Sequence, residues 1–184
     1  MFIEKIIWLV THGETRLQDS GGWCPDPAMT EEAYRGMRQI EIKLLQLLQD
    51  GILPEIQCGT GKRQYQVAQA LGLNFETYHL HFSGIWGDAS TLIKVDGVRK
   101  VLLGHGLIID YSKYDTTMHV SGEVIKRIIT ALSHNTVICS GRPVLIRLGM
   151  KPEDCHSGAL YSLKPQENGE IKIELVQQGR VLPS

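Results

Sequence analysis

The sequence has no excess of charge of either sign, since 19 lysines and arginines stand against 20 aspartates and glutamates in 184 residues. Nucleic acid and anionic membranes are therefore not expected partners, and any anion site must be local. No apolar run approaches the roughly 20 residues that span a bilayer, and Glu4 and Lys5 interrupt the opening MFIEKIIWLV, which argues against a signal peptide. The four cysteines form no C-x-x-C pair and have no zinc-finger spacing. We therefore expect a reduced, cytoplasmic chain with no metal site and no cofactor.

Length and composition predict one soluble globular domain over residues 1–184, with a variable insertion at about residues 72–120. Apolar residues spaced three and four apart, with Gly and Pro at their boundaries, predict helices at 30–51, 62–71, 121–132 and 143–149. Apolar runs predict strands at 3–10, 55–58, 75–82, 99–103, 136–139, 159–163 and 171–176.

Strands that alternate with helices predict a three-layer α/β/α sandwich around a mostly parallel central sheet. Asn168-Gly169 predicts a hairpin between the last two strands. Ligands of such sheets bind at the carboxyl ends of the strands, where we expect three loops to meet, at 11–16, 58–63 and 140–142. Glycines in these loops are expected to point backbone N–H groups at an anion.

His12 lies at this edge, in the segment Thr11-His12-Gly13-Glu14-Thr15 that follows the first predicted strand. A neutral imidazole there can attack phosphorus, and Gly13 would let a phosphoryl group approach the backbone closely. On its own, the triplet His-Gly-Glu is explained equally well by a histidine whose ring is hydrogen-bonded within its loop.

The segment resembles the Arg-His-Gly-Glu-Thr hallmark of the histidine phosphatase superfamily, also called the phosphoglycerate-mutase-like family. The resemblance implies a phosphoglycerate-mutase-like fold and a phosphatase or mutase that forms a phosphohistidine. Further segments similar to those of the family lie at 29–32, 62–73, 84–86 and 137–147.

By this resemblance His12 is the catalytic nucleophile and Arg63 clamps the phosphate, with Gly13 beside it and Gln18 in place of a phosphate-binding asparagine. Cys58-Gly59 replaces the Ser-Ser phosphate loop. Three catalytic positions are degenerate. Thr11 replaces the arginine of the hallmark, Gly141 replaces the second histidine, and a position near Leu80 replaces the proton-donating acid. Removing one donor of this kind typically lowers the rate by about 10²–10³-fold.

Some residues could substitute for the lost groups. Arg142 lies at the start of a predicted helix and could restore positive charge, although a solvent-facing arginine is as good an interpretation. His79 and His81 share one strand face near the lost acid, while His105 copies the second-histidine motif without a preceding helix. Restoring Thr11→Arg together with Gly141→His is expected to raise turnover of an aryl phosphate.

Three functions stay open. The first is a degenerate member that binds a phosphoryl group at His12, with weak or lost phosphatase activity. The second is an active phosphomonoesterase that uses His12 with rearranged partners. The third is a non-catalytic interaction module. The expected partner is a phosphorylated small molecule or phosphate anion, and a homo-oligomer is left open.

Overall fold

The computed structural model describes residues 6–15, 28–48, 54–59, 62–73, 77–78, 100–102, 108–110 and 122–179. The helices are α1 (Glu31–Leu47), α2 (Lys62–Ala70), α4 (Gly122–Ala131) and α5 (Arg142–Arg147). The strands are β1 (Ile7–Thr11), β2 (Glu55–Cys58), β3 (Thr77–Tyr78), β4 (Lys100–Leu102), β5 (Ile108–Asp110), β6 (Thr136–Ser140), β7 (Ala159–Pro165) and β8 (Ile171–Gln178).

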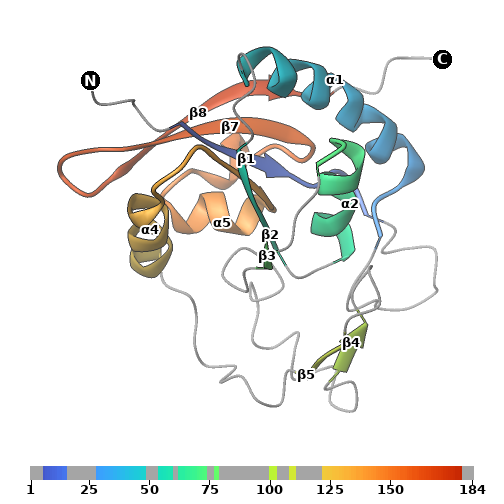
Figure 1. Cartoon of the computed structure of the whole chain (residues 1–184), viewed down its shortest axis with the longest axis horizontal. Helices are drawn as coiled ribbons and strands as arrows, with labels where there is room; N and C mark the ends of the chain where they lie inside the picture. Colours follow the sequence, from blue (N-terminus) through green and yellow to red (C-terminus); the bar gives the residue numbers. More distant parts are fainter. Residues whose placement is uncertain are drawn as a thin grey trace.

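A six-stranded sheet in the order β3-β2-β6-β1-β7-β8 forms the centre of the molecule (Figure 1). Strands β3, β2, β6 and β1 pair in parallel, whereas β7 is antiparallel to both β1 and β8. The predicted mostly parallel sheet is therefore correct for only part of the sheet. The tight connection at Asn168-Gly169, where Gly169 has φ of +81°, explains the antiparallel pair β7–β8, because so short a connection can join only antiparallel strands.

Helices cover both faces of this sheet, which confirms the three-layer architecture (Figure 1). Strand β1 is buried at all of its positions, as predicted for a strand covered on both sides. Its side chains alternate, so that Trp8 and Val10 pack with α1 and α2 while Ile7 and Leu9 pack with α4 and α5. The strand is thereby fixed in register and carries the residues after Val10 to the sheet edge.

The boundaries of the helices agree with the sequence in most places. The side chain of Thr30 caps α1 by accepting a hydrogen bond from the backbone N–H of Ala33 at 3.1 Å, as predicted. The predicted stop of this helix at Gly51 lies outside the described residues. Helix α5 begins at Arg142 with Gly141 as its N-cap, so Pro143 is its second residue and not its first.

Strands β4 and β5 pair with each other in a separate two-stranded antiparallel sheet, within the predicted insertion at 72–120. Strand β3, from the same stretch, pairs instead with β2 in the central sheet. Among the described residues, no helix combines the length and the apolar character that crossing a membrane requires.

Candidate functional site

Three loops meet at the carboxyl ends of β1, β2 and β6, as the sequence predicts. The backbone N–H of His12 donates to the carbonyl oxygen of Ser140 at 3.0 Å, and that of Gly59 donates to Cys139 at 2.9 Å. These bonds continue the parallel ladders beyond the strand ends. They bring His12 next to Gly141 at the start of α5.

The main chain and the ring of His12 are both held. Its carbonyl oxygen accepts a hydrogen bond from Gly158 N–H at 3.0 Å, and its Nδ1 lies 2.8 Å from the carbonyl oxygen of Gly13. Because a carbonyl oxygen can only accept, Nδ1 carries the proton and Nε2 keeps its lone pair. The Nε2 edge faces Gly141, where a β-carbon would lie only 3.0 Å from Nε2.

The His12 ring is neutral at physiological pH. Burial, followed by the positive charge of Arg63 and, more weakly, that of Arg142, lowers the pKa of His12 from 6.5 to about 3, while the hydrogen bond to Gly13 opposes this shift. A neutral imidazole with a lone pair on Nε2 is the form that attacks phosphorus. The hydrogen bond within the loop engages Nδ1, and no hydrogen bond of Nε2 is formed with the described residues. A histidine held by its own loop therefore does not explain the whole ring.

Two arginines lie at the starts of helices that cover opposite faces of the sheet. Half-buried Arg63 is the second residue of α2, whereas exposed Arg142 is the first residue of α5. The positive charges of both arginines oppose protonation of His12. The structure thus gathers two of the predicted phosphate ligands around the predicted nucleophile.

The expectation that glycine N–H groups in these loops point toward an anion is wrong for Gly13 and Gly59. The N–H of Gly13 donates to Sδ of Met29 at 3.3 Å, and that of Gly59 is bonded to Cys139. Gly13 is needed for packing, because a β-carbon there would lie 2.6 Å from Cβ of Ala33. Cys58, in place of the phosphate loop, is fully buried beside Cys139 in the core.

Thr11, which replaces the hallmark arginine, turns its hydroxyl away from His12. Its Oγ1 donates to the carbonyl oxygen of His156 at 2.8 Å and accepts a hydrogen bond from Ala159 N–H at 3.0 Å. Thr11 is fully buried. The sequence contains no signal for this contact, because its partners lie 145 and 148 residues away along the chain.

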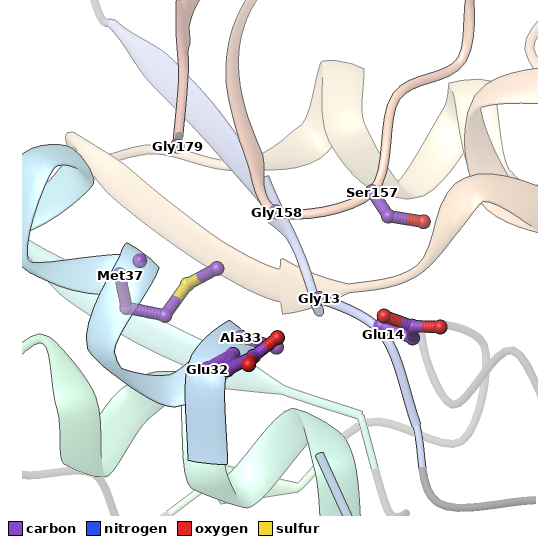
Figure 2. A pocket seen from close by; sticks show the side chains of 9 residues that line it. Gly13, Glu14, Glu32, Ala33, Met37, Ser157, Gly158 and Gly179 are labelled. Carbon is purple, nitrogen blue, oxygen red and sulfur yellow. The ribbon is translucent and has the colours of Figure 1, made fainter. Parts of the chain in front are cut away.

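A cavity of about 180 Å³ lies next to Gly13, between α1 and the segments 13–14 and 157–158 (Figure 2). Glu14 and Glu32 line it, whereas His12 does not. Two carboxylates repel a phosphate, so this cavity is not the anion site. Sequence reasoning missed it because Gly36, Gly158 and Gly179, which also line it, come from separate segments.

The remaining predicted site residues lie outside the described part of the chain. These are Gln18, Leu80, His79, His81 and His105. Within the described residues, no cluster of three or more His, Cys, Asp or Glu side chains could hold a metal ion. Cys58, Cys139 and Cys155 are all free thiols.

Comparison with solved structures identifies proteins with the same fold. Rv3214 from Mycobacterium tuberculosis superposes with a TM-score of 0.55 at 14% identity, covering 96% of this chain and 98% of that one. A protein assigned as an α-ribazole-5′-P phosphatase from Escherichia coli gives 0.54 at 16% identity, over 97% of this chain and 100% of that one. The protein histidine phosphatase SixA, solved with tungstate, gives 0.53 at 13% identity, over 92% of this chain and 94% of that one.

Neither the protein-family models nor the curated proteins give a match to this sequence. The fold that the resemblance implies is nevertheless confirmed, because these solved structures, among them a protein histidine phosphatase, share it over almost the whole chain. At these identities the likeness concerns the fold, and the activity has to be argued from the site.

Proposed function

We propose that this protein binds a phosphoryl group or phosphate anion at Nε2 of His12, between Arg63 and Arg142, with weak or lost phosphatase activity. The observation that carries this proposal is the His12 ring, which is held by the hydrogen bond of Nδ1 to Gly13. Burial and the positive charges of Arg63 and Arg142 lower its pKa and keep it neutral, with the lone pair on Nε2. Arginine is suited to phosphate because its planar fork of N–H donors matches two phosphate oxygens. The phosphatase-like structural neighbours, one of them bound to tungstate, support the same ligand chemistry.

Weak turnover follows from the donors that are missing. A phosphoryl transition state spreads negative charge over three equatorial oxygens, which need positive donors on several sides. Thr11 uses its hydroxyl for a backbone contact, and Gly141 has no side chain. We expect turnover of an aryl phosphate at least ~10³-fold below that of a family member that keeps both arginines and both histidines. Turnover comparable to that of such a member, abolished in His12→Ala, would favour the active phosphomonoesterase.

Phosphate titration followed by thermal unfolding tests the binding site. We expect a dissociation constant of roughly millimolar and a rise in Tm that grows with phosphate concentration. Arg63→Ala and Arg142→Ala should each weaken binding by about tenfold, as expected for a lost charge-assisted hydrogen bond.

Arg127→Ala is the matched control for these two variants. It removes the same charge from α4, where Arg127 lines a surface depression together with Gly169 of the final hairpin. That hairpin is at the opposite end of β7 from Ala159 and hence from the site. Equal loss of affinity in all three variants would indicate attraction by net charge only. No stabilisation of the wild-type protein by phosphate would contradict the proposal and favour the interaction module.

A further inference from the structure

A connected set of hydrogen bonds leads from the Thr11 side chain to the ring of His12. Its first part is the Thr11 hydroxyl, which bonds to the turn at 156–159 twice, at the carbonyl oxygen of His156 and at the N–H of Ala159. The same turn is held from its other side by Tyr161, whose hydroxyl accepts a hydrogen bond from His156 N–H at 2.7 Å. Thr11 and Tyr161 are both fully buried, so water does not replace these bonds readily.

The second part runs from this turn to the imidazole. Gly158, inside the turn, donates its N–H to the carbonyl oxygen of His12 at 3.0 Å. That oxygen belongs to the peptide group that links His12 to Gly13, so the bond sets the orientation of the next residue. The carbonyl oxygen of Gly13 is in turn the acceptor for Nδ1 of His12 at 2.8 Å. Two hydrogen bonds thereby connect the turn to Nδ1 of His12.

We propose that Thr11 is a positioning residue for the nucleophile: by holding the turn at 156–159 it fixes the His12–Gly13 peptide and keeps the Nε2 lone pair of His12 free. This inference deepens the proposed function and rests on it for its relevance to phosphoryl binding. The chemistry of the position agrees, because a hydroxyl both donates and accepts, whereas a guanidinium has no acceptor and could not bind Ala159 N–H. The residue that replaces the hallmark arginine therefore has a role of its own.

The test compares Thr11→Val, Thr11→Ser and the wild-type protein by ¹⁵N NMR of the imidazoles at pH 7. The wild-type protein and Thr11→Ser should show His12 protonated at Nδ1. Thr11→Val keeps the shape of the side chain but loses both hydroxyl bonds, and it should show a mixture of the two tautomers.

Thr136→Val is the matched control. Thr136 is also fully buried, and its hydroxyl also donates to a backbone carbonyl, that of His134 at 3.0 Å, but it begins β6 at the end of the sheet far from Ser140. A general loss of stability would affect both valine variants, whereas only Thr11→Val should change the His12 tautomer. If Thr11→Val does not fold, Tyr161→Phe loosens the same turn and should change the tautomer in the same direction.

The inference is overturned if Thr11→Val, or Tyr161→Phe in its place, keeps the Nδ1-protonated form, or if Thr136→Val changes the tautomer equally. The tautomer measurement needs no ligand, so it tests the role of Thr11 even if the wild-type protein binds no phosphate. Absence of phosphate binding would contradict the proposed function alone.

Discussion

The low pKa of His12 predicts that acid destabilises this protein through one ring. In the unfolded chain a histidine binds a proton as the pH falls through about 6.5, whereas the folded protein holds His12 neutral down to about pH 3 because of burial and the charges of Arg63 and Arg142. Between these values the unfolded state binds more protons, so the free energy of unfolding decreases as the pH is lowered. The free energy of unfolding is therefore unaffected by this group well above pH 6.5, and the decrease reaches its full size toward pH 3.

The size of the effect follows from the two pKa values. Between pH 7 and pH 4.5 the linkage relation gives a loss of about 2–3 kcal/mol for this single group. Because the His12 side chain is only half-buried, water that reaches the ring reduces the difference between the two pKa values, and the loss of about 2–3 kcal/mol is an upper value. A loss of this size is a large part of the stability of a typical domain, about 5–15 kcal/mol.

Urea unfolding of the wild-type protein and of His12→Gln at both pH values isolates this contribution. His12→Gln removes the titrating ring, so its free energy of unfolding should fall less between pH 7 and pH 4.5 than that of the wild-type protein. His134→Gln is the matched control, because it makes the same substitution at a histidine that is exposed at the surface. Identical pH dependence of the wild-type protein and His12→Gln would refute the assignment of a buried, neutral His12.

Two further predictions concern the residues around His12. Gly13→Ala should destabilise the fold by about 1–3 kcal/mol, since its β-carbon would lie 2.6 Å from Cβ of Ala33. Gly36→Ala, in α1 with nothing within 4 Å of the new β-carbon, should instead stabilise the fold by about 0.5–1 kcal/mol. Equal changes in the free energy of unfolding, measured in urea, would contradict the close packing at Gly13. The double variant Thr11→Arg, Gly141→His should fold less stably than the wild-type protein, because the first change leaves Ala159 N–H without its acceptor and the second places a β-carbon 3.0 Å from Nε2 of His12. Its turnover of an aryl phosphate, expected to rise as both charge contacts return, is therefore measured per folded molecule, and a folded double variant with no gain would assign the main defect to the acid position near Leu80.

The sequence by itself determined the layers of this fold and the neighbourhood of His12. Apolar periodicity is a local property of the chain, so it located β1, β6, α1 and α2 within a few residues of their observed bounds. The order of these elements then required their carboxyl ends to share one sheet edge. For that reason the sequence predicts that His12, Arg63 and Arg142 lie at one edge of the sheet.

Only the tertiary structure decided how the polar groups at that edge are used. Whether Thr11 contacts a ligand or a turn 145 residues away, and whether the N–H of Gly13 faces an anion or Met29, depends on contacts between segments that are distant along the chain. The same holds for the charge state of His12, which results from burial and from arginines on two different helices. Hydrogen bonds and desolvation act through space, so a one-dimensional pattern identifies the residues of such a site but not the partners that fix their chemistry.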